Sequence, residues 1–272
     1  IFRYVKKVSV VIPTQRPGYS ILNCLNSIEQ QSISKDFYKV YIALNGPKEP
    51  YFMFLMSLLN NYSFQYELIY LETPNVSCAR NHLIDISSEA FIAFIDDDDM
   101  ISTCYIEELV KVADDFQISI SNSFNYKIEL DNIEPNHLGK SFCKLDFSES
   151  SLYKTRKYFS PVYAKLISRN IIGSVRFNQK INIGEDSLFM AEISPFVKGI
   201  NKALTNTACY YINQRVGSVT RKKMNKIKEL KRIVFILFFY TRMLLSGKYD
   251  KIFIVSRIAA TFKHHLKEVI IN

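Results

Sequence analysis

The sequence predicts an α/β protein with a mostly parallel, Rossmann-like central sheet flanked by helices. Three observations support this fold class. Strand patterns alternate with helical patterns over roughly the first hundred residues, each strand pattern ends in a turn, and polar side chains follow the strand ends directly. Sheets of this kind bind their ligands at the carboxyl ends of the strands, so we expect the functional residues there.

The first strand is predicted at Val8–Ile12, an apolar and mostly β-branched run closed by Pro13. Apolar residues then recur at helical spacing from Ile21 to Ile28. A second strand follows at Tyr38–Leu44, which completes one βαβ unit. The alternation continues with a helix at Phe52–Leu59, a strand at Tyr66–Leu71, a helix at Ala79–Ile86 and a strand at Ala90–Ile95.

The pattern weakens beyond residue 100. We expect a helix over Tyr105–Phe116, strands within Ile118–Leu130, and a polar loop region over 131–160. From Lys222 onward the pattern is that of two basic amphipathic helices, roughly 225–245 and 250–268, joined by Ser246-Gly247.

These patterns predict one main domain over 1–220 and a C-terminal helical appendage over 221–272. The main domain divides into a first half, 1–100, which carries the regular alternation, and a second half, 101–220. An apolar share of 48% with 22% charged residues is typical of a folded globular chain.

The formal net charge of +9 fits a nucleic acid, an anionic membrane surface or an acidic small ligand as partner. Most of the excess is C-terminal, because residues 213–272 hold fourteen Lys and Arg against three acidic residues. Five widely spaced cysteines without a CxxC pair favour a reducing cytosol. The longest apolar run, Ile233–Tyr240, is too short to span a bilayer, and no export signal is visible. We therefore expect a cytoplasmic location, at the inner face of the cytoplasmic membrane if the C-terminal helices bind lipid.

Four consecutive aspartates, Asp96 to Asp99, close the apolar run AFIAFI and are the most specific feature of the sequence. Carboxylates are hard oxygen ligands suited to Mg²⁺ or Mn²⁺, and such ions often share their coordination between one or two carboxylates and substrate phosphates. The alternative is an acidic turn that caps the next helix. One aspartate would satisfy that alternative, whereas four adjacent like charges favour a divalent metal.

The opening VSVVIPT, the ARN at 79–81, the FIDDDD at 94–99 and the GED at 184–186 resemble the family 2 glycosyltransferases of the GT-A fold, in order and in spacing. The resemblance covers roughly residues 7 to 220. It implies a metal-dependent, inverting hexosyl transfer from a nucleotide-sugar, with a UDP-sugar expected, in the synthesis of bacterial cell-surface polysaccharide such as capsule. The acceptor would be a glycan or a polyprenyl-linked glycan.

The resemblance also implies roles for the aspartates, since the family motif has the form Asp-x-Asp-Asp. Asp96 would contact the nucleoside, Asp98 would bind the metal, Asp99 would shape the donor-sugar pocket, and Asp97 would fill the variable position. A register that starts at Asp97 stays open.

Other expected contacts to the nucleotide-sugar come from Pro13, Thr14 and Arg16 after the first strand and from Asn45 and Gly46 after the second. Family members commonly carry an acidic residue where this chain has Asn45. An amide both donates and accepts, so base recognition is retained while a preference for uracil is less certain.

Arg80 would lie beside the base or diphosphate, and by resemblance Asp186 is the base that takes the acceptor proton, with Glu185 orienting the acceptor. Taken alone, an acidic pair that starts a helix is as well explained by capping. Arg215 and Ser218 resemble a late family segment that closes over the diphosphate, and a solvated basic loop is an equal alternative.

The C-terminal helices have two readings of equal weight. Apolar residues along one face, flanked by lysines and arginines, suit an anionic membrane, but they equally suit packing on the main domain or on a second subunit in a homodimer. A nucleotidyltransferase is a weaker alternative, because the loop PTQRPGYS has a single glycine, and a nucleic-acid-binding module is weaker still. Since the chain has no Trp, it lacks the late Gln-x-x-Arg-Trp motif of processive members, and we expect a single transfer.

Overall fold

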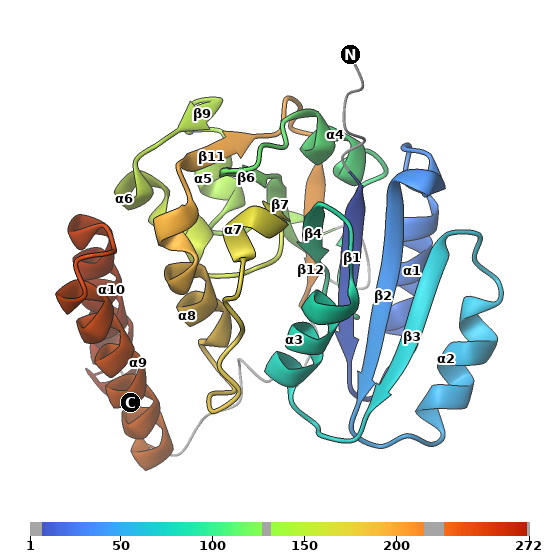
Figure 1. Ribbon diagram of the computed structural model, residues 1–272, viewed down its shortest axis with the longest axis horizontal. Coiled ribbons are helices and arrows are strands. Elements are labelled where there is room, and N and C mark those ends of the chain that lie inside the picture. Colours follow the sequence, from blue (N-terminus) through green and yellow to red (C-terminus); the bar gives the residue numbers. More distant parts are fainter. Residues whose placement is uncertain (1–6, 127–131, 215–225, 271–272) are drawn as a thin grey trace.

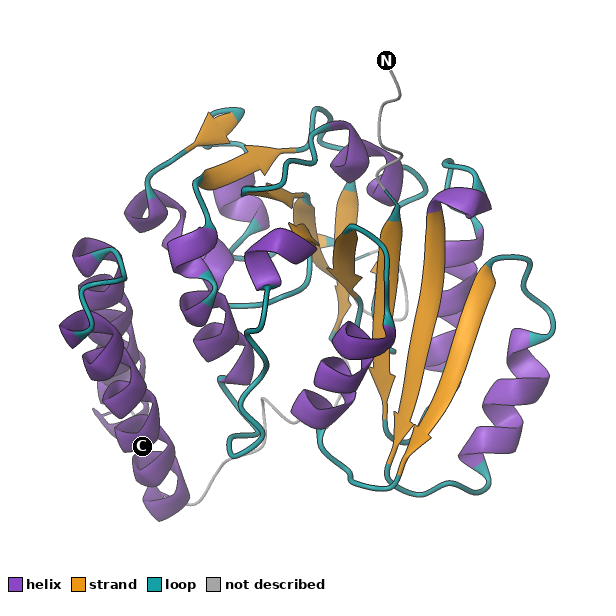
Figure 2. Ribbon diagram, in the orientation of Figure 1, coloured by secondary structure: helices purple, strands orange, loops and turns teal. Residues whose placement is uncertain are grey.

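The computed structural model describes residues 7–126, 132–214 and 226–270, with side chains up to residue 263. An eight-stranded sheet forms the centre of the molecule, and Figures 1 and 2 show helices on both of its faces. The strand order is β3-β2-β1-β4-β10-β6-β11-β9. Every regular element predicted between residues 8 and 95 is present, within a few residues at its ends.

The first four strands run parallel and bring their carboxyl ends to one edge of the sheet (Figure 1). Val11 of β1 lies between Tyr41 of β2 and Phe94 of β4 in the register. The side chains of β1 are buried along its whole length, as expected of a central strand covered on both faces. The strands are β1 (Val8–Thr14), β2 (Tyr38–Asn45), β3 (Gln65–Leu71) and β4 (Phe91–Phe94).

The second half of the chain completes the same sheet. β10 (Lys165–Ser168) runs antiparallel to both of its neighbours, β4 and β6 (Gln117–Ile120), and so joins the two halves. Beyond β6 lie β11 (Gly199–Lys202) and β9 (Ser148–Glu149). A four-stranded sheet has the order β5 (Met100–Ile101), β12 (Cys209–Asn213), β7 (Asn122–Tyr126) and β8 (Glu134–Pro135).

The helices that flank the sheet follow the predicted alternation. Figure 1 shows α1 behind the sheet and α3 in front of it. In the first half, the helices are α1 (Ser20–Glu29), the short η1 (Lys35–Phe37), α2 (Tyr51–Leu59) and α3 (Val76–Ile86). In the second half, they are α4 (Tyr105–Lys111), α5 (Gly139–Phe142), α6 (Leu152–Thr155), η2 (Arg156–Phe159), α7 (Arg169–Ile172), α8 (Glu185–Glu192) and η3 (Ser194–Phe196).

Two expectations for the second half were wrong. The helix that begins at Tyr105 ends at Lys111, because Asp114 accepts a hydrogen bond from the Phe116 amide (2.8 Å) and this local turn competes with the helix. Where described, the expected loop over 131–160 contains the short elements β8, α5, β9, α6 and η2. None of these is long enough to show a period.

Aromatic packing fixes α8 against the central sheet. The rings of Phe177 and Phe189 stack with centroids 3.9 Å apart and planes at 7°, and Phe94 of β4 meets both rings edge-on. Large buried aromatic side chains contribute more than other residues to core stability. The N-terminus of α8 therefore has a defined place beside the end of β4.

The C-terminal helices α9 (Lys226–Leu245) and α10 (Lys251–Ile270) form the pair expected from the sequence and lie at one side of the molecule (Figure 1). Each helix buries one face, α9 through Ile236, Tyr240 and Met243, and α10 through Phe253 and Ile254. Packing on the main domain thus accounts for one face of each helix. Within the described residues, none of the helices is long and apolar enough to cross a membrane.

Candidate active site

The four aspartates form a tight turn at the end of β4. The Asp99 amide donates to the Asp96 carbonyl oxygen (3.1 Å), which reverses the chain. Asp96, Asp97 and Asp98 are partly exposed, whereas Asp99 is 3% exposed and its Oδ1 accepts from the Asn213 amide (2.9 Å). Burial, with the charges of Asp96 and Asp98, raises the pKa of Asp99 well above its usual range. The turn therefore leaves three aspartates partly exposed and anchors the fourth against β12.

Tyrosines from distant segments support this turn. The Asp96 amide donates to the Tyr210 hydroxyl (3.1 Å), and the Tyr126 hydroxyl donates to the Asp98 carbonyl oxygen (3.1 Å). Tyr163 stacks on Tyr210 with ring centroids 5.0 Å apart. These tyrosines were not predicted as site residues, because nothing in the local pattern around them indicates contact with the aspartates.

The ends of β1 and β2 lie beside the aspartate turn, as predicted. Thr14 is buried, and its hydroxyl donates to Asp97 Oδ2. With its amide group oriented to satisfy both neighbours, Asn45 donates to the Thr14 carbonyl oxygen (2.7 Å) and accepts from the Asn75 amide (3.1 Å). Asn75 also caps α3 by accepting from the Cys78 amide (3.0 Å).

Three further predicted residues occupy the loops at these strand ends. Gly46 has φ of +114°, a conformation that favours glycine, and its amide donates to the Leu71 carbonyl oxygen (2.9 Å). Pro13 is buried within β1, and Arg16 is exposed in the loop that follows. The predicted nucleotide-binding residues Arg215 and Ser218 lie outside the described residues.

Arg80 connects the aspartate turn to α8. Its side chain is 5% exposed, and its guanidinium reaches Asp96 Oδ1 (2.9 Å), Asp186 Oδ1 (2.6 Å) and Glu185 Oε1 (3.5 Å). Burial opposes the positive charge, but the three carboxylates outweigh it and raise the pKa of Arg80. The buried guanidinium thus links Asp96 and Asp186, which follow Arg80 by 16 and 106 positions in the chain.

Glu185 and Asp186 occupy the first turn of α8, after Gly184 in a left-handed conformation with φ of +92°. Burial, followed by the charge of Asp186, raises the pKa of Glu185 to about 7. Burial also raises the pKa of Asp186, although Arg80 opposes the shift. Asp186 Oδ2 faces the amide of Val162 (3.4 Å). These carboxylates therefore change protonation closer to neutral pH than ordinary surface carboxylates.

Lys165 is a buried cation that the sequence analysis did not identify. It lies on β10, is fully buried, and donates through Nζ to the Tyr163 carbonyl oxygen (2.9 Å). Burial lowers the pKa of Lys165 to about 7, while Asp186 favours its charged form. A lysine inside the apolar strand pattern VYAKLIS was the available signal, because such a position rarely holds a charge.

The C-terminal helices also hold α8. The hydroxyl of Ser187, next to Asp186, lies 2.8 Å from the Tyr240 hydroxyl of α9. Arg257 of α10 is buried and donates to Ser187 Oγ, to Ser160 Oγ (2.8 Å) and to the Arg156 carbonyl oxygen (3.3 Å). The carboxylates of α8 are therefore fixed from two sides, by Arg80 and by Arg257.

The donor set at the aspartate turn fits a divalent cation bound together with a diphosphate. Among the described residues, no three His, Cys, Asp or Glu side chains form a metal-binding group of their own. Mg²⁺ and Mn²⁺ bound with a substrate need only one or two protein carboxylates, since phosphate oxygens complete the shell. The partly exposed Asp96, Asp97 and Asp98 supply hard oxygen ligands of that kind.

Comparison with solved structures identifies the fold. Crystal structures of S. aureus TarS residues 1–349 superpose with a TM-score of 0.75 for the complex with UDP-GlcNAc and 0.70 for the complex with UDP. Sequence identity is 17% and 16%, and each alignment covers 96% of this chain, with 73% and 72% of TarS 1–349. This likeness, the strand order and the flanking helices define a GT-A fold with a C-terminal helical pair.

Sequence comparison then places the chain within that class. The model of glycosyl transferase family 2 matches residues 9–178, and the chain belongs to this family. It is 24% identical over 231 residues to glycosyltransferase GlyA of Streptococcus pneumoniae, and 24% identical over 219 residues to the poly(ribitol-phosphate) beta-glucosyltransferase of Bacillus spizizenii. These alignments cover 79% and 78% of this chain and 32% and 33% of the relatives. The chain thus spans about a third of the length of the curated relatives it matches.

Proposed function

We propose that this protein transfers a sugar, with inversion, from a UDP-sugar to the hydroxyl of a carbohydrate or lipid-linked oligosaccharide acceptor in the synthesis of a cell-surface polysaccharide. The observation that carries the proposal is the Arg80 bridge. It holds the carboxylate pair of α8 beside the strand-end aspartates, which brings the proposed base close to the proposed metal-binding turn. In this proposal, residues 1–100 bind the donor and residues 101–220 bind the acceptor.

The UDP moiety would lie at the carboxyl ends of β1, β2 and β4. Thr14, Asn45 and Asp97 already form one hydrogen-bonded edge there, next to Pro13, Gly46 and the exposed Arg16. The TarS structures with UDP-GlcNAc and UDP support this class of donor. Asp96 would contact the nucleoside. Asp99, whose carboxylate accepts a hydrogen bond from the Asn213 amide, would help to shape the donor-sugar pocket.

The divalent metal, Mn²⁺ or Mg²⁺, would be held by Asp98 and would neutralise the charge that develops on the departing diphosphate. Thr14, by hydrogen bonding Asp97, keeps that neighbouring carboxylate in a fixed orientation. Arg80 orients Asp96 from the side of α8. Arg215 and Ser218 are proposed to close over the diphosphate.

The acceptor hydroxyl would lose its proton to Asp186 as it attacks the anomeric carbon from the face opposite the diphosphate. Burial raises the pKa of Asp186, which makes its carboxylate a stronger base, while Arg80, 2.6 Å away, favours the ionised form that accepts the proton. Glu185 would orient the acceptor. Because the chain has no Trp, and so lacks the motif of processive members, we propose one sugar per binding event.

The donor site is tested by calorimetric titration of UDP, with GDP and CDP as controls, with and without Mn²⁺. We expect metal-dependent binding of UDP that is lost in Asp98→Ala and kept in Asp115→Ala, an exposed carboxylate outside the site. A well-folded protein that binds none of the three nucleotides would rule out the proposed donor site.

The base is tested separately with Asp186→Asn. This variant should bind UDP and Mn²⁺ like the wild type and lose transfer by about a hundredfold or more, the usual contribution of a general base. Transfer at the wild-type rate would show that another group takes the proton.

A further inference from the structure

The C-terminal helical pair exposes a second apolar face, separate from the one it buries. On α9 the exposed apolar residues are Ile227, Leu230, Val234, Phe238 and Leu245, and on α10 they are Ile252, Val255 and Phe262. Each of these side chains is between 50% and 80% exposed. Single exposed apolar residues are ordinary, but stripes at helical spacing on two adjacent helices indicate a binding surface. We call these eight residues the outer face.

Helix geometry places the outer face opposite the buried one. Val234 and Phe238 each lie two positions before a buried residue of α9, Ile236 and Tyr240, and two positions in a helix correspond to about 200°. On α10, Val255 lies two positions after the buried Phe253, which gives the same angular separation. Since both helices bury their inner faces against the rest of the protein, both outer stripes point away from it.

Positive charge surrounds the outer face. Residues 226–263 contain nine Lys and Arg against two acidic residues, and all of the nine except the buried Arg257 are exposed or half-exposed. Both acidic side chains form contacts within the helical pair: Glu229 forms an ion pair with Arg232, and Asp250 accepts a hydrogen bond from the Phe253 amide (2.7 Å). Arg242 lies beside the stripe, with its guanidinium 5.7 Å from the centre of the Phe238 ring.

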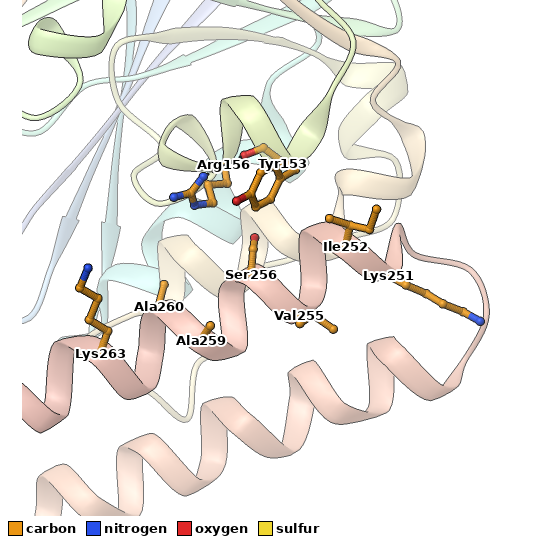
Figure 3. A pocket seen from close by; sticks show the side chains of 9 residues that line it. All are labelled: Tyr153, Arg156, Lys251, Ile252, Val255, Ser256, Ala259, Ala260 and Lys263. Atoms are coloured by element: carbon orange, nitrogen blue, oxygen red, sulfur yellow. Dashed lines mark hydrogen bonds between the residues drawn. The ribbon is translucent and has the colours of Figure 1, made fainter.

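A cavity of about 600 Å³ adjoins this face between α10 and the segment of α6 and η2 (Figure 3). Its α10 side is formed by Ile252, Val255, Ala259 and Ala260, and Lys251 and Lys263 lie at opposite ends (Figure 3). On the other side, the Arg156 guanidinium packs over the Tyr153 ring at 4.9 Å. The cavity thus combines an apolar wall with cations at its margin.

We propose that the outer face docks on an anionic lipid bilayer, with its apolar side chains at the acyl boundary, its lysines and arginines at the lipid phosphates, and a lipid chain in the cavity. Apolar burial and attraction to anionic headgroups together hold interfacial helices on membranes. A second copy of the chain fits less well, because a two-fold interface through this face would bring like charges together. A nucleic acid would leave the apolar stripes without a partner.

The test is co-sedimentation of the 272-residue chain with vesicles of phosphatidylglycerol and phosphatidylcholine, compared with vesicles of phosphatidylcholine alone. We expect binding to the anionic vesicles only. Val234→Ser/Phe238→Ser should weaken it at least about tenfold, since two apolar anchors are lost. The matched control Met53→Ser/Met56→Ser changes two exposed apolar residues of α2 and should bind like the wild type.

A charge variant separates the two contributions. Lys228→Glu/Lys231→Glu should weaken anionic binding at least about tenfold, whereas Lys140→Glu/Lys144→Glu, two exposed lysines elsewhere, should not. Equal binding to neutral and anionic vesicles, or no binding by folded protein, would overturn the proposal. So would a dimer in sedimentation analysis that Val234→Ser/Phe238→Ser dissociates. None of these readouts depends on sugar transfer, so they do not depend on the proposed function.

Discussion

Arg80 shows how one side chain organises the candidate site at the residue scale. Asp96, Asp186 and Glu185 come from two elements far apart in the sequence, and each lies within 3.5 Å of the same buried guanidinium. Without the cation, three carboxylates would share a partly buried space, which is unfavourable for all of them. The ion pairs therefore hold the aspartate turn and α8 together, and they also compensate the charge of the three carboxylates.

Removing that cation should destabilise the protein strongly. We expect Arg80→Met to lower the free energy of unfolding by about 3 kcal/mol or more, because the buried carboxylates lose their partner. Urea denaturation measures the change. Arg176→Met is the matched control: its ion pair with Asp85 is half-exposed to solvent and should contribute at most about 1 kcal/mol. Equal losses in the two variants would contradict this account of Arg80.

The pKa of Glu185 predicts a second residue-scale effect. It is raised from 4.5 to about 7, so between these values the folded protein binds more protons than the unfolded chain. Stability contributed by protonated Glu185 is thus present at low pH and is lost as pH rises from 4.5 to 7. Relative to Glu185→Gln, which does not titrate, the wild type should lose on the order of 3 kcal/mol across this window.

Urea denaturation of both proteins at pH 4.5 and pH 7 measures this difference. Glu192, whose pKa burial raises to about 7, titrates in both proteins and cancels. A difference that stays constant between the two pH values would show that Glu185 ionises normally in the fold.

At the scale of elements, α8 depends on contacts from three directions. Phe189 of α8 stacks on Phe177. Arg80 forms an ion pair with Asp186 in the first turn of the helix. From the C-terminal helices, Tyr240 and Arg257 form hydrogen bonds with Ser187. Its position is therefore set by long-range packing, which explains why the pattern around residues 184–190 alone could not separate a helix cap from a catalytic pair.

Tyr240→Phe tests the contribution of the C-terminal helices to α8. Loss of the hydroxyl leaves Ser187 and Arg257 with fewer partners, and we expect about 1 kcal/mol lower stability. If Asp186 is the base, kcat should fall while UDP affinity stays unchanged. Tyr66→Phe, at an exposed position of the edge strand β3, is the control and should change neither quantity. A reduced UDP affinity in Tyr240→Phe would place the effect at the donor site instead.

At the scale of the whole molecule, the sequence predicted the first half of the fold far better than the second. Up to residue 95, apart from the short η1, each strand and helix is long enough to be predicted from its own pattern, and the consecutive strands β1, β2 and β3 pair with one another. Beyond residue 100, β10 pairs with β4 and β6, and β12 pairs with β5 and β7, so pairing is remote and strands are short. The site divides in the same way. The aspartates, Arg80 and Asp186 were found from motifs, whereas Tyr210, Tyr163 and Lys165 reach it only through tertiary structure.

The C-terminal helical pair packs closely on the rest of the protein. Its inner face buries five large side chains, Ile236, Tyr240, Met243, Phe253 and Ile254, and each buried apolar side chain contributes about 1.5–3 kcal/mol. Because a domain is stable by only about 5–15 kcal/mol, we expect a chain lacking residues 222–272 not to unfold cooperatively. Differential scanning calorimetry checks this. A sharp transition in the shortened chain would show that the pair is dispensable for folding.

The place of β10 in the sheet bears on how the chain acquires its fold during synthesis. β4 has β1 on one side, but its other edge is covered by Lys165–Ser168, which follows Phe94 after an interval of seventy residues. At about 5–20 residues per second, a ribosome needs roughly 4–14 seconds to add that interval. Throughout this time the nascent first half carries an open, apolar strand edge that favours association with other chains. Chaperone contact during translation is therefore expected to concentrate between the emergence of β4 and that of β10.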